Sequence, residues 1–213
     1  RSNGTDPKVI GFTELIEREL DSCSKIIADL LDFARERPLS ATPTPLRDLV
    51  EGAIALVPQG KNPIEIANLI PADLPVPTLD KEQFRQVLIN LIQNAVEALE
   101  PRGVGRVTVD ATRRGTSDWR LTIEDDGPGI PADMMAKIFE PLFTTKFKGT
   151  GLGLAIVAGI VRRHHGTIKV RSTVGQGTRF VIDWKERPPG VRTSGEFTAR
   201  PTPPVAAPSQ ETT

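Results

Sequence analysis

The stretch from residue 80 to residue 100 reads DKEQFRQVLINLIQNAVEALE and contains no glycine or proline. Asp80, followed three positions later by Gln83, is a typical helix start, because these side chains can satisfy the free N–H groups of the first turn. Apolar residues then recur at helical spacing on one face, at Phe84, Leu88, Leu91, Ile92, Ala95 and Leu99. The stretch therefore predicts a strong amphipathic helix that packs this face on a sheet and ends before Pro101.

Strands and shorter helices are predicted on both sides of this helix. Apolar and polar residues alternate in four segments, a pattern typical of half-buried strands: 106–112, 119–124, 167–172 and 178–184. Helices are expected over 46–57 and 152–164, and a brief strand over 64–66. Because strand pairs alternate with helices and no regular βαβ repeat is present, the predicted fold class is α+β, a two-layer sandwich.

The N-terminal residues predict a separate helix. Apolar residues in 7–37 lie alternately four and three positions apart, at Ile16, Leu20, Cys23, Ile27, Leu30 and Ala34. A second apolar set widens the stripe, so we expect a helical bundle whose partner helices come from outside this chain or from another copy of it. Residues 38–45 are then predicted to be a hinge, residues 46–186 the main domain, and residues 187–213 a disordered, Pro-rich tail.

The composition argues against several classes of protein. The chain has 27 Lys and Arg against 27 Asp and Glu, and this zero net charge disfavours a dedicated nucleic-acid binder or a polybasic membrane binder. The single cysteine, Cys23, excludes an internal disulfide and fits a reducing compartment. The longest apolar run, 155–161, is too short to span a bilayer. We therefore expect a soluble chain, which could still be part of an anchored protein.

Two asparagines on the long helix are the first candidate ligands. Asn90 and Asn94 are four positions apart, so their side chains point about 40° apart on a face other than the apolar one. Neutral amide oxygens suit a hard cation such as Mg²⁺, which usually needs one or two protein oxygens in addition to phosphates. The alternative is that both are ordinary exposed polar residues, and the spacing alone leaves the two interpretations open.

Glycine-rich segments supply the other candidates. DDGPGI at 125–130 follows a predicted strand; its glycines let the backbone approach a ligand, and Asp125 could accept a hydrogen bond from an amino group such as that of adenine. GTGLGL at 149–154 opens a helix and presents free N–H groups to an anion such as phosphate. Between them lies the loop FEPLFTTK at 139–146, and Lys146 and Lys148 could add positive charge. Alternatively, the first segment is an ordinary turn and the lysines are solvated.

Two familiar glycine motifs do not fit the run at 149–154. A dinucleotide-binding fingerprint needs a strand immediately before it, whereas a loop precedes this run. A Walker A loop needs Lys and then Ser or Thr after its last glycine, whereas Leu154 stands there.

Taken in this order, the segments resemble the ATP-binding domain of sensor histidine kinases. Their family boxes correspond, in order, to 90–95 (N box), 125–129 (first glycine box), 139–143 (F box), 149–154 (second glycine box) and 175–178 (last glycine motif). The likeness covers about residues 46–184 and implies the Bergerat-type α/β sandwich. LLDFAR at 30–35 resembles the second helix of the family's dimerisation hairpin, and FTTK resembles the nitrogen-regulation type.

The resemblance implies roles for individual residues. Asn94 would hold Mg²⁺ with help from Asn90, Asp125 would accept the adenine amino group, and Thr178 would support Asp125. ATP would lie under a mobile lid over about 131–148. The remaining implied nucleotide-binding residues are Gly127, Gly129, Ile130, Thr144, Thr145, Lys146, Lys148, Gly149, Thr150, Gly151, Leu152, Gly153 and Leu154.

One position favours a kinase over a hydrolase. The related gyrase, chaperone and mismatch-repair ATPases carry a water-activating glutamate where Asn90 stands, and an amide cannot take a proton at neutral pH. The implied activity is therefore transfer of the ATP γ-phosphoryl group to a histidine, for relay to the aspartate of a response regulator. The alternatives are a nucleotide-binding pseudokinase scaffold and a serine-kinase or ATPase relative of the same fold.

The acceptor histidine is missing from its usual place in this chain. The only histidines, His164 and His165, end the predicted helix over 152–164 and are expected to be cap or surface residues. We therefore expect the chain to bind Mg-ATP without phosphorylating itself. The implied partners are a receiver domain and a second copy through 7–37, with a membrane only through a missing sensor part. The implied location is the cytoplasm, either as a free protein or as the cytoplasmic part of a membrane-bound sensor.

Overall fold

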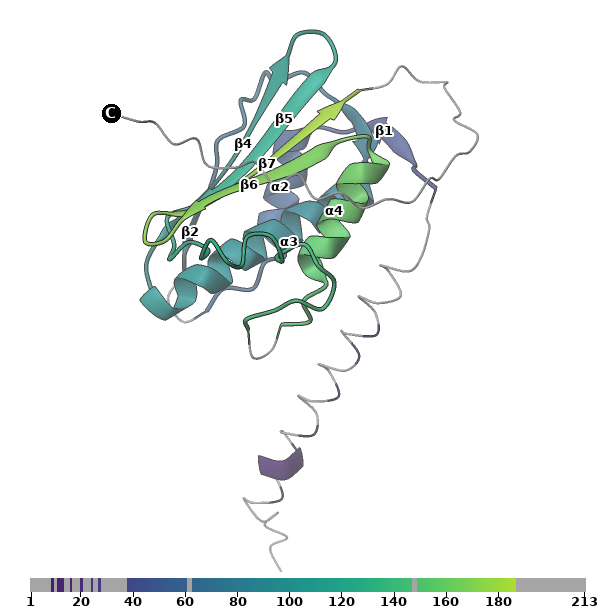
Figure 1. Ribbon diagram of the computed structural model, residues 1–213. Helices are drawn as coiled ribbons and strands as arrows, with labels where there is room; N and C mark the ends of the chain where they lie inside the picture. Colours follow the sequence, from purple (N-terminus) through teal and green to yellow (C-terminus); the bar gives the residue numbers. More distant parts are fainter. Residues whose placement is uncertain are drawn as a thin grey trace, which may run out of the picture.

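The computed structural model describes residues 38–60, 63–146 and 149–186, together with residues 9, 11–13, 16, 20, 24 and 27 (Figure 1). The described residues form a five-stranded sheet in the order β2-β4-β5-β7-β6. Its strands are β2 (Glu65–Asn68), β4 (Arg106–Arg114), β5 (Asp118–Asp125), β6 (Thr167–Thr173) and β7 (Gly177–Lys185). β2 pairs with β4 in parallel, and the other neighbours are antiparallel.

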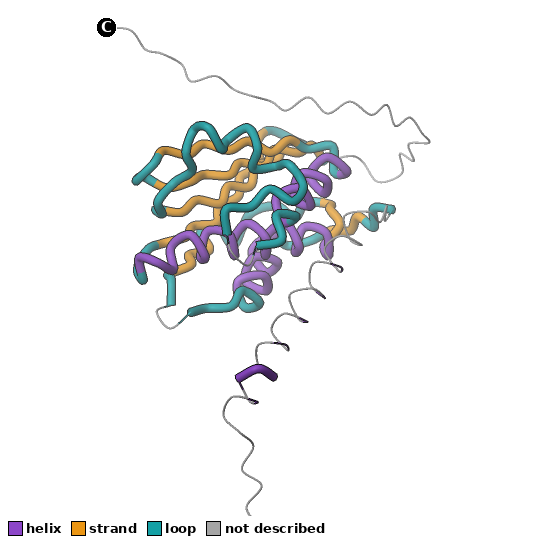
Figure 2. Tube along the Cα trace, turned by 60° about the horizontal axis from the view of Figure 1, so that its bottom comes forward, coloured by secondary structure: helices purple, strands orange, loops and turns teal. Residues whose placement is uncertain are grey.

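Three helices cover one face of this sheet: α2 (Leu46–Ile54), α3 (Lys81–Leu99) and α4 (Gly153–Arg163). Figure 2 shows the strands in one layer and the helices in the other. A 3₁₀ turn, η1 (Glu100–Arg102), follows α3 and ends at Gly103, which has a left-handed φ of 67°. The structure thus confirms the predicted α+β, two-layer sandwich.

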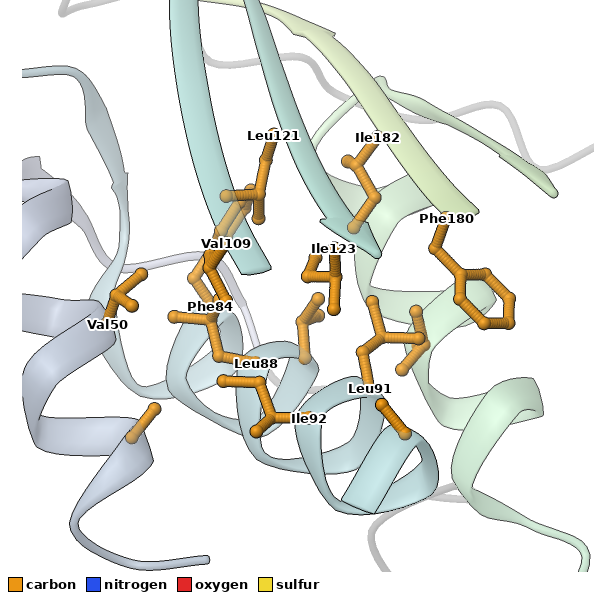
Figure 3. Close-up of a cluster of buried hydrophobic side chains, with 14 of the residues drawn as sticks. Val50, Phe84, Leu88, Leu91, Ile92, Val109, Leu121, Ile123, Phe180 and Ile182 are labelled. Carbon is orange, nitrogen blue, oxygen red and sulfur yellow. The ribbon is translucent and has the colours of Figure 1, made fainter. Parts of the chain in front are cut away.

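The core lies between α3 and the sheet (Figure 3). Burial alternates along β5, where Leu121 and Ile123 are buried on the helix side. All six residues of the predicted apolar face of α3 are buried. Because full burial of one such side chain stabilises the fold by about 1.5–3 kcal/mol, this face holds α3 on the sheet.

The predicted start of α3 is confirmed. The Asp80 carboxylate accepts a hydrogen bond from the backbone N–H of Gln83 (3.0 Å) and another from the Gln83 side chain (3.1 Å). It also accepts from the backbone N–H of Ser40 (2.9 Å). Asp80 therefore both caps α3 and holds the incoming chain against it.

A small second sheet has no counterpart in the sequence prediction. β1 (Ala41–Pro43) lies in the segment predicted as a hinge and pairs antiparallel with β3 (Thr78–Asp80). Both strands have three residues and lie beside prolines, so neither shows the alternation that predicts a strand. Their pairing joins residues nearly 40 positions apart, and it attaches the predicted hinge to the start of α3.

Eight residues of the predicted N-terminal helix are described. Residues 9, 11–13, 16, 20, 24 and 27 are helical, and the large apolar side chains among them are 51–65% exposed: Val9, Phe12, Ile16, Leu20 and Ile27. The rest of 7–37, including Cys23, and the tail 187–213 lie outside the described residues. No helix in the described part of the chain is long and apolar enough to cross a membrane.

His164 joins the two long helices. It is the C-cap residue of α4 and is 7% exposed, so it is a cap residue and not a surface residue. Its Nε2 accepts a hydrogen bond from the backbone N–H of Asp80 (3.1 Å), and its Nδ1 lies 2.9 Å from the carbonyl oxygen of Ile160. These contacts require a neutral ring with its proton on Nδ1. His165 is exposed.

The burial of His164 predicts a dependence of stability on pH. Burial lowers the pKa of His164 from its usual 6.5. As the pH falls through about 6.5, the unfolded chain takes up this proton first, so the free energy of unfolding should fall by at most about 1.4 kcal/mol per pH unit and level off below the folded pKa. Urea unfolding of wild type and His164→Gln between pH 7.5 and 5 measures this loss.

His164→Gln keeps an oxygen that can accept the Asp80 N–H but does not titrate, so its unfolding free energy should fall less over this range. His165→Gln is the control and should follow wild type. Parallel curves for wild type and His164→Gln would show that His164 does not carry the effect.

Candidate functional site

The N-terminus of α4 meets the middle of α3. A Cβ atom added at Gly153 would lie 3.1 Å from Asn90 Oδ1, so glycine allows this approach. Leu152, the residue before α4, is 1% exposed and anchors the start of the helix in the core. The structure thus brings Asn90, one of the two predicted asparagines of α3, to the glycine segment at 149–154.

The start of α4 has the properties of an anion site. Its N-cap residue, Leu152, offers no side-chain cap, and the first turn has no acidic residue. The N–H of Leu152 donates to Thr150 Oγ1 (3.3 Å). The first-turn N–H groups and the helix dipole therefore favour a phosphate at this end.

Asp125 ends β5 on the other side of the site. Its side chain is 7% exposed, and its Oδ1 accepts the backbone N–H of Gly127 (2.9 Å). Burial raises the pKa of Asp125, whereas the backbone N–H groups of Gly127 and Thr178 oppose the rise. The carboxylate remains an acceptor that is largely shielded from water, which suits recognition of an amino group.

Close backbone contacts join the first glycine segment to the turn between β6 and β7. A Cβ atom at Gly129 would lie 2.2 Å from the carbonyl oxygen of Thr173, and one at Gly177 would lie 1.9 Å from that of Asp125. The N–H of Gly175 donates to the carbonyl oxygen of Pro128 (2.8 Å). Only glycine fits at these two contacts, so the segments at 125–130 and 172–178 form one unit.

Ser172 belongs to this unit and was not predicted. Its Oγ accepts the N–H of Ile130 (2.7 Å) and lies 3.0 Å from Thr178 Oγ1. Thr178 itself is buried and lies directly opposite Asp125 in the β5–β7 pairing. A serine in an alternating strand carries no signal for such a contact, so only the structure could reveal it.

The loop between Ile130 and the second glycine segment contacts the sheet and the segment before α4. Phe139 meets Phe180 edge to face, with ring centroids 6.5 Å apart. The N–H of Leu142 donates to the carbonyl oxygen of Gly151 (3.0 Å), and Leu142 is exposed with a left-handed φ of 67°. Phe139 therefore attaches the loop to β7, and the backbone of Leu142 attaches it to the segment before α4.

Lys146 lies against α3. Its Nζ donates to Asn94 Oδ1 (2.8 Å) and also pairs with the Glu97 carboxylate. Glu97 was not predicted, although its place three residues after Asn94 on the same helix could have indicated it. Thr144 Oγ1 accepts the N–H of Lys146 (3.0 Å), and Thr145 is exposed beside it. Lys148 lies outside the described residues.

Three predicted residues have side chains directed into the core. Leu152 is buried, and Ile130 and Leu154 are partly buried against the same cluster.

Two hollows adjoin the sheet. One of about 190 Å³ borders Asp125, Ser172 and Thr178, at the end of the strands where the glycine segments meet. Another, of about 370 Å³, lies at the opposite end of β5 and β7 beside Trp119 and Trp184, and none of the predicted site residues lines it.

Residues 79–188 match the family described as histidine kinase-, DNA gyrase B-, and HSP90-like ATPase. The chain belongs to this family. The match covers every segment that the structure brings together, from α3 to β7. As a member of this family, the chain carries an ATP-binding domain.

Its relatives include sensor histidine kinases. ZraS of Escherichia coli O157:H7 is 36% identical over 80% of this chain and 37% of its own length. The histidine kinase/phosphatase NtrB of Rhizobium leguminosarum bv. phaseoli is 33% identical over 80% of this chain and 48% of its own length, in keeping with the predicted nitrogen-regulation likeness. The chain thus spans less than half the length of these two relatives, and it carries the ATP-binding domain of a sensor histidine kinase.

Solved structures show the same fold. Full-length ShkA in complex with AMPPNP superimposes with a TM-score of 0.74 and 28% identity, over 86% of this chain and 40% of ShkA. Histidine kinase ThkA in complex with the response regulator TrrA gives 0.68 and 28%, over 88% of this chain and 53% of ThkA.

The glycine contacts lead to a prediction for a matched pair of variants. Gly129 and Gly115 both have left-handed φ angles, 73° and 67°, but a Cβ atom at Gly115 would meet nothing within 4 Å. Gly115→Ala should lower the free energy of unfolding by about 1–2 kcal/mol through backbone strain alone. Gly129→Ala should lower it by about 1–3 kcal/mol more, because its methyl group must displace the Thr173 carbonyl. Urea unfolding measures both, and equal losses would contradict the close contact.

Proposed function

We propose that this chain is the ATP-binding catalytic core of a two-component sensor histidine kinase. It transfers the γ-phosphoryl group of ATP to a histidine outside the described site, for relay to an aspartate of a response-regulator receiver domain. The observation that carries this proposal is the close approach of Asn90 on α3 to the start of α4, where no side chain caps the helix, together with buried Asp125 at the end of β5.

The two sides of the site suit the two ends of ATP. Asp125, an acceptor shielded from water, fits the amino group of adenine, and Thr178 supports it from β7. The first-turn N–H groups of α4 and Lys146 fit the phosphates. AMPPNP, an ATP analogue, is bound in the related ShkA structure, which supports this assignment.

The residues on α3 fit a metal ion. Asn94 Oδ1 already holds a cation, the Lys146 ammonium group, so this oxygen is accessible to positive charge. No group of three His, Cys, Asp or Glu side chains that could hold a metal occurs in the described part of the chain, so Mg²⁺ would rely on Asn94, Asn90 and phosphate oxygens. When bound, Mg²⁺ neutralises the charge that develops on the phosphates.

The site favours transfer over hydrolysis. Asn90 stands where a water-activating base would be required, and its amide cannot accept a proton. A neutral imidazole, in contrast, needs no base before it attacks phosphorus. His164 cannot be this acceptor, because it is buried and both of its ring nitrogens are engaged.

Partners follow from the same proposal. The related ThkA forms a complex with a response regulator, which supports a receiver domain as partner here. The exposed apolar side chains between Val9 and Ile27 support a homodimer through residues 7–37. Use of ATP favours a cytoplasmic location for this domain.

A transfer experiment tests the proposed activity. The chain is mixed with a separate polypeptide that carries the acceptor-histidine hairpin, with Mg²⁺ and γ-labelled ATP. We expect acid-labile label on the hairpin and none on this chain alone. Asn94→Ala should slow transfer by about 100-fold, the order expected when one preorganised electrostatic group is lost.

Gln86→Ala is the matched control, because Gln86 lies one turn before Asn90 on α3 and outside the site. It should transfer as wild type does. Nucleotide binding without any transfer to the hairpin would instead favour a nucleotide-binding scaffold. Transfer that Asn94→Ala leaves unchanged would remove Asn94 from the metal site.

A further inference from the structure

Glu97, a residue to which no role has been given above, helps Asn94 to hold Lys146 against α3. The Lys146 Nζ atom lies 2.8 Å from Asn94 Oδ1 and pairs at the same time with the Glu97 carboxylate. The two side chains are 39% and 34% exposed, so the pair lies at the edge of the site and not in bulk solvent. The ammonium group of Lys146 thus contacts Asn94 Oδ1, the oxygen that the proposed function assigns to Mg²⁺.

Hydrogen bonds with neighbouring groups position both Glu97 and Lys146. Gln93 Nε2 donates to Glu97 Oε1 (2.8 Å), which leaves the other carboxylate oxygen for Lys146. The Lys146 backbone is held at both of its polar groups, because its N–H donates to Thr144 Oγ1 and its carbonyl oxygen accepts the N–H of Gly149 (3.2 Å). These bonds and the contacts with α3 therefore position Lys146 together.

The ammonium group and a metal ion cannot share this oxygen comfortably. Mg²⁺ binds oxygen at about 2.0–2.1 Å, so both cations on one amide oxygen would be only a few ångströms apart. At that distance like charges repel strongly wherever water is partly excluded. Binding of a magnesium nucleotide must therefore move Lys146 away from Asn94.

We propose that Glu97 is a positioning residue that holds Lys146 on Asn94 until a magnesium nucleotide displaces it. Glu97 thereby opposes nucleotide binding in the free protein and makes the release of Lys146 part of nucleotide entry. This inference rests on the proposed function, because it requires the nucleotide to bind at Asn94.

Nucleotide affinity measures the effect. Glu97→Gln keeps the size of the side chain and one acceptor oxygen but removes its charge. It should therefore tighten binding of fluorescently labelled ADP in excess Mg²⁺ by about two- to fivefold, the factor that one exposed ion pair supplies. ADP is the probe because it has no γ-phosphate to attract the released lysine. Glu82→Gln is the control; it breaks the ion pair with Arg85 at the far end of α3 and should leave the affinity unchanged.

A double-mutant cycle separates this role from a simple charge effect. Removing a carboxylate near phosphates would tighten binding by itself, with or without Lys146. If Glu97 acts by holding Lys146, Glu97→Gln should change the affinity in wild type but not in the Lys146→Met background. Hydrogen exchange without nucleotide supplies a second measurement: the amides of 139–146 should exchange faster in Glu97→Gln than in Glu82→Gln.

Three results would overturn the inference. An equal gain of affinity in both backgrounds would show that Glu97 acts through its charge alone, and weaker binding by Glu97→Gln would place Glu97 in contact with the metal or nucleotide. If wild type binds labelled ADP but the amides of 139–146 exchange equally fast in Glu97→Gln and Glu82→Gln, the contact does not hold the loop. Failure of wild type to bind any labelled ADP would refute the proposed function itself.

Discussion

The site depends on the burial of one face of α3. Phe84, Leu88 and Leu91 are fully buried against the sheet, and their burial sets both the position and the rotation of the helix. Asn90 and Asn94 project from the same rigid helix, so their positions follow from the packing of the core. A change that loosens this face would therefore move the side-chain oxygens proposed to bind Mg²⁺, although it contacts neither of them.

The other side of the site depends on the absence of side chains. Gly129 and Gly177 let three backbone segments touch at the end of β5, and these contacts bury Asp125 among N–H donors.

Charged side chains of opposite sign are distributed in local groups over the molecule. Bidentate pairs such as Arg120–Asp183 balance the outer face of the sheet, while the site separates a carboxylate at one end from Lys146 at the other. The zero net charge of the whole chain is the sum of these local positive and negative groups.

Much of the fold could be predicted because its longer elements repeat a periodic pattern. The 3.6-residue period of α3 and the alternation in β5 and β7 each reflect one buried face, and all three elements lie where the pattern placed them. β1 and β3 were missed because three residues beside prolines show no period. Their pairing is a long-range contact, and it converts part of the predicted hinge into a strand.

For the site, the amino-acid sequence by itself determined which residue types are present and in what order: amides on a helix, a carboxylate before glycines, and glycines before a helix. These are local properties of the chain, so motifs report them. Only the tertiary structure decided that Lys146 lies on Asn94 and Glu97, that Ser172 supports Thr178, and that His164 is buried against Asp80. Each of these contacts joins side chains from different elements, and their distances depend on how the helices and the sheet pack together.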